Sequence, residues 1–102
     1  MNFTVIVLSG ATADLEAIHE SLGAYSEGTA DRTSDLIERA VLGLNEFPRR
    51  FALARESKGC SIEIRQMTVG NYRVLYQIIG DKVRVMRIIH ASRGTLRPMD
   101  LM

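Results

Sequence analysis

Residues 72–93 constrain the fold more than any other part of the sequence. They read YRVLYQIIGDKVRVMRIIHASR, two apolar runs separated by Gly80-Asp81. A glycine accepts the positive φ required at the first position of a two-residue type II′ turn, so this pair is typical of a tight β-hairpin. We therefore expect strands at 72–79 and 82–90, with Ile79 opposite Lys82. This turn then determines which side chains share a face of the sheet.

The rest of the chain predicts four further elements. An apolar, β-branched run at 3–8 indicates a first strand. Apolar residues at helical spacing indicate helices within 15–25 and 37–47, and a proline ends the second. The short break between them favours an antiparallel helical hairpin. A basic loop at 49–60 then leads to a strand at 61–68.

This order of elements predicts an α+β fold. The N-terminal strand, the antiparallel two-helix hairpin and a three-stranded antiparallel meander are expected to form one sheet with the helices packed on one face. With 102 residues, of which 46% are hydrophobic, the chain suits one domain spanning residues 1–102.

The turn before Tyr72 decides which side chains of the meander face the helices. A two-residue Gly70-Asn71 turn would place Glu63 and Arg65 in the core, so a three-residue loop that starts at Val69 is expected. The predicted core face then carries Tyr72, Val74, Tyr76, Ile78, Val83, Val85, Arg87 and Ile89. The predicted outer face carries Glu63, Arg65, Met67, Arg73, Leu75, Gln77, Arg84, Met86, Ile88 and His90.

The predicted outer face has an apolar stripe bordered by arginines. Such a surface suits an acidic, amphipathic partner segment, unless the helical hairpin or the C-terminal tail covers it. The residues expected to bind that segment are Met67, Leu75, Met86, Ile88, Arg65 and Arg84. Buried in the core, by contrast, Arg87 would require an acidic partner.

Charge is segregated along the chain although the formal net charge is only +1. Residues 1–48 hold eight acidic and two basic residues, whereas residues 49–102 hold eleven basic and four acidic residues. The two parts therefore carry about −6 and +7, a polarity that indicates nucleic-acid or acidic-protein partners. Nine of the eleven bases are arginines, which bind carboxylates and phosphates through a planar fork.

The compartment and cofactors are predicted from what the sequence lacks. Cys60 is the only cysteine, so no internal disulfide forms, and alone it makes no zinc site. The apolar run at 3–8 is too short for a signal-peptide core or a membrane span. We expect a cytoplasmic protein that needs no metal or other cofactor.

Several short motifs follow one another in a recognisable order. They are SGATADLEAI near the start, LNEFP at the end of the second helix, GNYRVLYQIIGDKVRVMRIIHASR in the meander, and a terminal LRP. In this order and spacing they resemble the RelE/ParE superfamily of type II toxins, with ParE-like and plasmid-stabilisation sequences the more similar. The resemblance covers nearly the whole chain. It implies a bacterial growth inhibitor encoded beside an antitoxin, whose acidic amphipathic segment binds and silences it in a hetero-oligomer.

Two activities occur in this superfamily, and the resemblance alone leaves both open. ParE-like members inhibit DNA gyrase by binding, which is the favoured reading because the chain has only two lysines and little net charge. The residues expected to contact that target are Arg73, Arg87, Arg93 and Arg97. RelE-like members are ribosome-dependent messenger-RNA endonucleases. That chemistry would use Arg73 to stabilise the phosphate, His90 as acid, and Glu63 or Glu56 as base. A non-toxic binding module is a third, weaker alternative.

Overall fold

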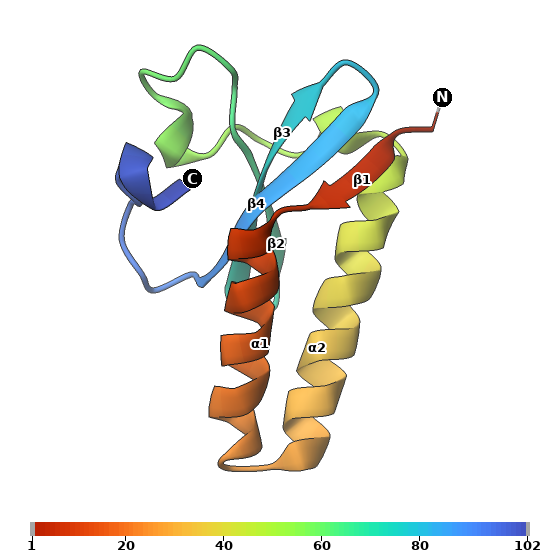
Figure 1. Cartoon of the computed structure of the whole chain (residues 1–102), viewed down its shortest axis with the longest axis vertical. Coiled ribbons are helices and arrows are strands. Elements are labelled where there is room, and N and C mark those ends of the chain that lie inside the picture. The colour runs from red at the N-terminus through yellow and green to blue at the C-terminus, as the bar shows by residue number, and fades with distance from the viewer. Residues whose placement is uncertain (1, 102) are drawn as a thin grey trace.

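The hairpin predicted from residues 72–93 lies at the centre of the sheet (Figure 1). The computed structural model describes residues 2–101. Its sheet has four strands in the order β1-β4-β3-β2, in which β1 is parallel to β4 and the other pairs are antiparallel. The strands and helices are β1 (Thr4–Val7), α1 (Ser9–Gly23), α2 (Glu27–Leu42), β2 (Arg65–Val69), β3 (Tyr72–Ile79) and β4 (Lys82–His90).

The two central strands have the predicted bounds, and the predicted turn joins them. Ile79 pairs with Lys82, and Gly80 has a φ of 60°. An L-residue with a side chain rarely adopts this left-handed backbone, so glycine fits the position best. The turn chemistry therefore located both strands correctly.

A β-bulge in β4 changes the predicted faces of the hairpin. Tyr76 pairs with Val85, but the next residue of β3, Leu75, pairs with Arg87. Met86 is the extra residue, and everything beyond it in β4 turns to the opposite face. Ile88 therefore points toward the helices, contrary to the prediction. The predicted Leu75–Met86 pair does not form.

The turn between β2 and β3 also differs from the prediction. Val69 pairs with Tyr72, so the connection is the two-residue Gly70-Asn71 turn that the sequence argument rejected. Met67 consequently pairs with Val74 on the helix side. The shorter turn is possible because β2 begins only at Arg65, so Glu63 lies in the preceding loop and is exposed.

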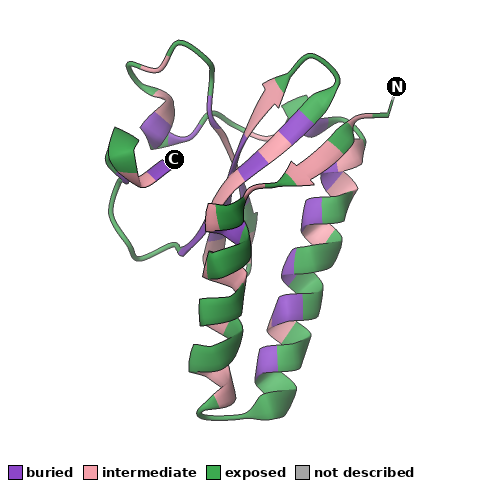
Figure 2. Ribbon diagram, in the orientation of Figure 1, coloured by how far each residue is buried: buried purple, intermediate pink, exposed green. Residues whose placement is uncertain are grey.

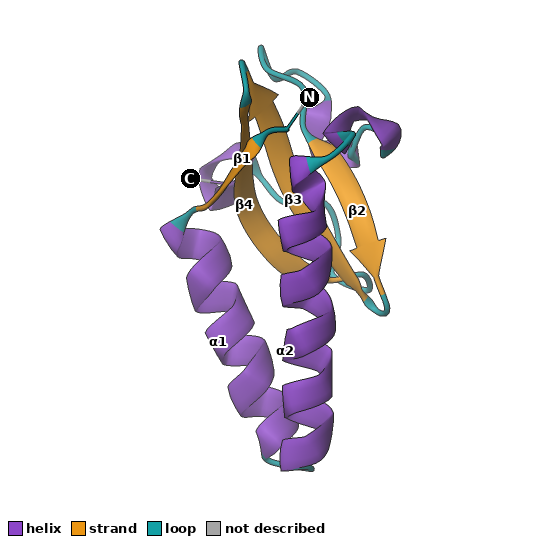
Figure 3. Ribbon diagram, turned by 90° about the vertical axis from the view of Figure 1, so that its right-hand side faces the viewer, coloured by secondary structure: helices purple, strands orange, loops and turns teal. Residues whose placement is uncertain are grey.

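Both helices pack on the same face of the sheet as an antiparallel hairpin (Figure 3). The Ser26 side chain caps α2 by accepting a hydrogen bond from the Thr29 amide at 3.2 Å. The buried positions of α2 form a stripe along the helix (Figure 2), as expected of an amphipathic helix on a sheet. The core between helices and sheet consists of Ala11, Ile37, Val41, Leu44, Met67, Val74, Tyr76, Val83, Val85 and Ile88.

A second, smaller core covers the outer face of the sheet. It forms where the loop before β2 and the C-terminal 3-10 helix, Pro98–Leu101, fold over β3 and β4 (Figure 1). Its buried members are Ala54, Ile64, Leu75, Ile89, Leu96 and Leu101. The sheet is therefore buried on both faces. None of the helices within residues 2–101 has the length and apolar character needed to cross a bilayer.

Candidate docking site on the outer face of the sheet

A buried ion pair holds the loop before β2 against the outer face. Arg73 of β3 donates to both carboxylate oxygens of Glu56, at 3.0 Å and 2.8 Å, and also to the side-chain oxygen of Gln66 at 2.9 Å. The side chains of Arg73 and Glu56 are only 5% and 0% exposed. Oε2 of Glu56 also accepts the amide of Leu96 at 3.0 Å, so one carboxylate joins the sheet, the loop and the tail.

This pairing removes two candidate catalytic groups from chemistry with an external substrate. The hydrogen bond from Arg73 lowers the pKa of Glu56 to about 2 against the opposing effect of burial, so the carboxylate is a weak base. The Arg73 guanidinium is equally enclosed and faces Glu56 rather than solvent. Neither group is placed to contact RNA.

A second arginine attaches the tail to the first helix. Arg87 donates to Asp14 of α1 through Nε at 2.6 Å and Nη2 at 2.9 Å, and to the backbone oxygen of Asp100 through Nη1. Asp14 also accepts the amide of Ile88 at 2.9 Å. The hydrogen bond to Asp14 raises the pKa of Arg87. The acidic partner that a buried Arg87 was expected to need is Asp14, although the bulge places Arg87 beside Leu75 on the outer face.

The remaining catalytic candidates lie apart from Arg73. His90 pairs with Tyr72 at one end of the hairpin, with its ring edge-on to the tyrosine at 5.4 Å between centroids. Its Nδ1 accepts the amide of Ser92 at 3.0 Å, because a backbone N–H can only donate. Glu63 is exposed and lies just before β2, toward the other end of the hairpin. The structure thus does not bring the four predicted catalytic residues together.

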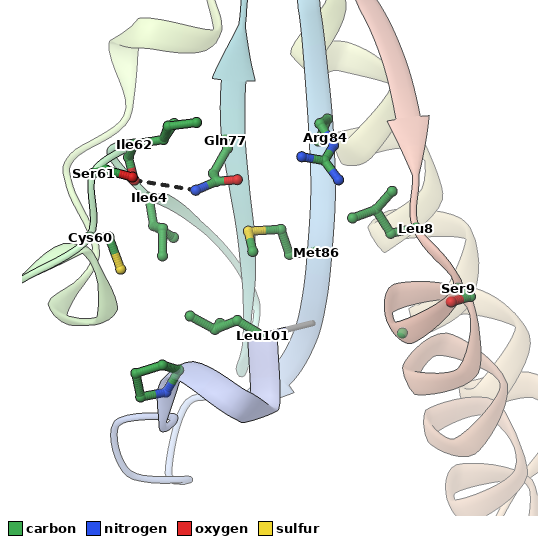
Figure 4. Close-up of a pocket in the computed structure, with 12 residues that line it drawn as sticks. Leu8, Ser9, Cys60, Ser61, Ile62, Ile64, Gln77, Arg84, Met86 and Leu101 are labelled. Atoms are coloured by element: carbon green, nitrogen blue, oxygen red, sulfur yellow. Dashed lines mark hydrogen bonds between the residues drawn. The ribbon is translucent and has the colours of Figure 1, made fainter.

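An open groove remains beside the tail on the outer face (Figure 4). Its volume is about 640 Å³, and it lies between the start of α1, the loop at 60–64, the two central strands and the C-terminal 3-10 helix. Gln77 Nε2 donates to the Ile62 carbonyl at 3.2 Å and so fixes one wall. Apolar side chains dominate its lining, with Arg84 as the charged member. The apolar lining residues are Leu8, Ile62, Ile64, Met86, Pro98 and Leu101.

Only two of the residues predicted to bind a partner segment line this groove. Arg84 and Met86 do so, and both are half-buried. Met67 and Ile88 are buried in the core under the helices, which corrects their predicted place on the outer face. Leu75 lies on the outer face as predicted but is fully covered by the loop and tail.

Arg65, the sixth predicted residue, has a structural role at the sheet edge. It is half-buried and donates to the carbonyl oxygens of Arg49 and Phe51, at 3.2 Å and 2.7 Å. It shares the helix side of the sheet with Met67 because β2 has the shorter turn. These contacts hold the chain between α2 and β2 rather than an external partner.

The predicted target-binding arginines divide into two groups. Arg73 and Arg87 are engaged in the two ion pairs above. Arg93 and Arg97 are exposed on the segment that leads to the tail. The guanidinium of Arg97 makes a long contact with Asp100, 3.4 Å between Nε and Oδ2, and the Arg97 side chain is 74% exposed. The pKa of Asp100 is lowered, chiefly by a hydrogen bond from the Arg97 amide.

Sequence reasoning missed the groove residues contributed by the loop and the tail. Ile62 and Ile64 were assigned to a regular strand, and Leu101 was assigned no contact. Hydrogen bonds of Arg73 and Arg87 hold their segments against the sheet, and the apolar packing of the second core adds to this attachment. Arginines on an otherwise apolar strand were the only available signal, and it did not identify their partners.

Comparisons with known proteins find a family model and a relative that are both described as toxins. A model of the family described as "ParE toxin of type II toxin-antitoxin system, parDE" matches residues 5–94. Toxin RelE2 of Caulobacter vibrioides is 32% identical over 84 residues, which cover 81% of this chain and 89% of the relative.

Two solved structures share the fold. A chain of the chromosomal ParDE system from P. aeruginosa superposes with a TM-score of 0.73 at 19% identity, covering 86% of this chain and 95% of that one. A chain of the toxin-antitoxin complex RelBE2 from Mycobacterium tuberculosis gives a TM-score of 0.57 at 22% identity, covering 88% and 99%. The predicted RelE/ParE-like α+β fold is therefore confirmed.

Proposed function

Since the chain belongs to the ParE toxin family of type II toxin–antitoxin systems, we propose that it inhibits bacterial growth by binding DNA gyrase in the cytoplasm. In this proposal the chain catalyses no reaction. Direct binding of a cognate antitoxin neutralises it.

The observation that carries the proposal is the enclosure of Arg73 and Glu56. Cleavage of RNA by its own 2′-hydroxyl needs a base, a cation for the developing charge and an acid within reach of one phosphate. Here the cation and one of the two candidate bases neutralise each other inside the protein. His90 pairs with Tyr72 rather than lying beside Arg73 on the outer face, and Glu63 is distant from both. A toxin that acts by binding needs no such cluster.

The groove on the outer face is the surface best suited to the antitoxin. Its apolar lining would accept the apolar side of an amphipathic segment, and Arg84 would pair with a carboxylate on that segment. The basic character of residues 49–102 supports an acidic partner there. Ile62, 41% exposed at the rim, would become buried on binding.

Arg93 and Arg97 are the arginines best placed to contact the target. They are exposed, and the segment between β4 and the 3-10 helix at Pro98–Leu101 carries them. Their removal should reduce toxicity in steps, because binding surfaces lose affinity residue by residue, whereas loss of a catalytic group abolishes turnover.

A supercoiling assay with purified gyrase tests the proposal. The wild-type chain should inhibit supercoiling, Arg93→Ala and Arg97→Ala should each weaken inhibition, and the double variant should weaken it further. His90→Ala, folded by circular dichroism, should inhibit like the wild type. If expression of the wild-type chain arrests growth but the purified chain at saturating concentration leaves supercoiling undiminished, gyrase is refuted as the target. Absence of growth arrest would instead favour the non-toxic binding module.

Messenger-RNA cleavage on the ribosome is the second candidate, favoured by the name of the Caulobacter relative, Toxin RelE2. Toe-printing of messenger RNA on ribosomes with the purified chain tests it. Codon-spaced cleavage that disappears with His90→Ala would establish this activity in place of gyrase binding. We expect the messenger RNA to stay uncleaved with both the wild-type chain and His90→Ala.

A further inference from the structure

The two helices form a second groove that contains no residue of the sheet. Each helix contributes four side chains at the spacing i, i+3, i+4 and i+7, which places them along one line of the helix surface. The volume is about 680 Å³. The helical hairpin extends past the end of the sheet (Figures 1 and 3), so its surface is open to a partner. The lining residues are Thr12, Leu15, Glu16 and His19 of α1 with Asp31, Ser34, Asp35 and Glu38 of α2.

Four of these side chains are carboxylates, and only one has a partner. Asp31 contacts His19 Nε2 at 2.8 Å. Glu16, Asp35 and Glu38 form no ion pair with any residue between 2 and 101. Unpaired like charges that line one groove repel each other, and an external cation would relieve that repulsion.

A buried hydroxyl in the same groove also lacks a partner. Ser34 is 9% exposed, and its Oγ has no hydrogen-bond partner within residues 2–101. Leaving such a group unpaired away from water costs free energy that a suitable donor would recover. The hydroxyl rotates freely about its C–O bond and can accept from a donor that enters the groove.

We propose that this groove binds an arginine or lysine side chain presented by a basic segment of a partner protein. A guanidinium offers five donors in a rigid fork, enough to bridge carboxylates of both helices and reach a hydroxyl between them. Nucleic acid is excluded because its phosphates would meet the acidic residues. A metal ion is disfavoured because no three His, Cys, Asp or Glu side chains within residues 2–101 are placed to hold one.

This surface is distinct from the proposed antitoxin site and independent of the gyrase proposal. The outer-face groove carries Arg84 and suits an acidic segment, whereas the helical groove suits a basic one. The opposite charges of the two halves of the chain thus correspond to two partners of opposite charge. The chain would bind both partners at the same time.

Titration of the isotope-labelled full-length chain with a hexa-arginine peptide at low ionic strength tests the inference by NMR. Amide shifts should concentrate in α1 and α2 around Ser34. Asp35→Asn with Glu38→Gln should weaken binding about tenfold, as expected for the loss of two partly exposed charge pairs. The matched control, Glu46→Gln with Glu63→Gln, removes the same charge from exposed acids outside the groove and should leave the affinity unchanged.

A second variant separates the built groove from general attraction to acid. Ser34→Ala keeps every charge and should weaken binding about threefold, whereas Ser21→Ala on the exposed side of α1 should not. The inference would be overturned if the control Glu46→Gln with Glu63→Gln weakened peptide binding as much as Asp35→Asn with Glu38→Gln. Amide shifts spread over the whole surface would also overturn it. Self-association of the wild-type chain that Asp35→Asn with Glu38→Gln abolishes would assign the groove to a second copy and also overturn it.

Discussion

Glu56 joins the loop before β2 to both β3 and the tail. Its carboxylate receives Arg73 from β3 and the Leu96 amide from the tail, so removing it would release two segments at once. The sequence offered Arg73 and Glu56 as functional candidates through its resemblance to RelE-like endonucleases, which would use them as cation and base. It could not show that they pair, because they lie seventeen positions apart, with irregular chain and sheet between them.

Removing one partner of this pair should destabilise the fold strongly. Glu56→Gln or Arg73→Met alone should each cost about 3–5 kcal/mol, because a buried charge is left unpaired. The double variant should cost less than either single variant, since no charge then remains. Urea unfolding of the four proteins measures the coupling energy. Additive losses would show that the pair is not coupled.

The same pair predicts how stability depends on acid. The pKa of Glu56 is depressed from 4.5 to about 2, so its contribution is fully present above pH 4.5 and is lost as the pH falls toward 2. The difference corresponds to about 3 kcal/mol. Urea unfolding of the wild type across this window should show the loss, and the Glu56→Gln, Arg73→Met double variant should lack that component. Parallel pH profiles for the two proteins would contradict it.

At the scale of elements, the bounds of β3 and β4 followed from the sequence, but the faces of the sheet did not. The Gly80-Asp81 turn located β3 and β4, whereas the bulge at Met86 reversed half of β4. The alternation of polar and apolar residues along β4 gave no sign of the bulge. Ile88 and Ile89 are both apolar, and they are buried on opposite faces of the sheet. Arg87 was the one residue at odds with the predicted faces, because it placed a charge in an otherwise apolar core. A one-residue shift in the register of β4 moves Arg87 out of that core and would have located the bulge.

The two-sided sheet predicts opposite results for two aspartate substitutions on the outer face. Leu75→Asp should prevent folding, with a cost above about 4 kcal/mol, because Leu75 is 0% exposed beneath the loop and tail. Ile62→Asp at the rim of the groove should fold and lose affinity for the antitoxin. Circular dichroism and titration calorimetry measure the two effects. A folded Leu75→Asp that has lost antitoxin binding would mean that the loop and tail do not cover the strand in solution.

In the whole molecule the acidic residues lie mainly within 1–48 and the basic residues mainly within 49–102. The sequence could not show which basic side chains form contacts within the protein. Arg65, Arg73 and Arg87 hold the loop and the tail, whereas Arg84, Arg93 and Arg97 are less enclosed by other residues. The effective positive surface is therefore smaller than the count of arginines implies. Within 49–102 the exposed bases are Arg93 and Arg97 before the tail, together with Arg49, Arg50, Arg55, Lys58 and Lys82.

This distribution predicts a moderate salt dependence of the antitoxin complex. Affinity should fall as added salt shortens the Debye length from about 30 Å to about 3 Å, because contacts at an exposed rim are screened. Arg84→Gln should reduce the dependence, whereas Arg65→Gln should not, since Arg65 is engaged with backbone carbonyls. Titration calorimetry over a salt series measures both slopes. Affinity independent of salt would indicate a purely apolar contact.

The parallel pairing of β1 with β4 has a consequence for biosynthesis. Thr4 pairs with Lys82, so β1 leaves the ribosome 78 residues before its partner and waits for it. At about 5–20 residues per second that delay is about 4–16 s. The tail that completes the outer face is translated later still. A nascent chain therefore has no finished groove until the tail has been translated, and an antitoxin already present in the cell can meet the toxin as it folds.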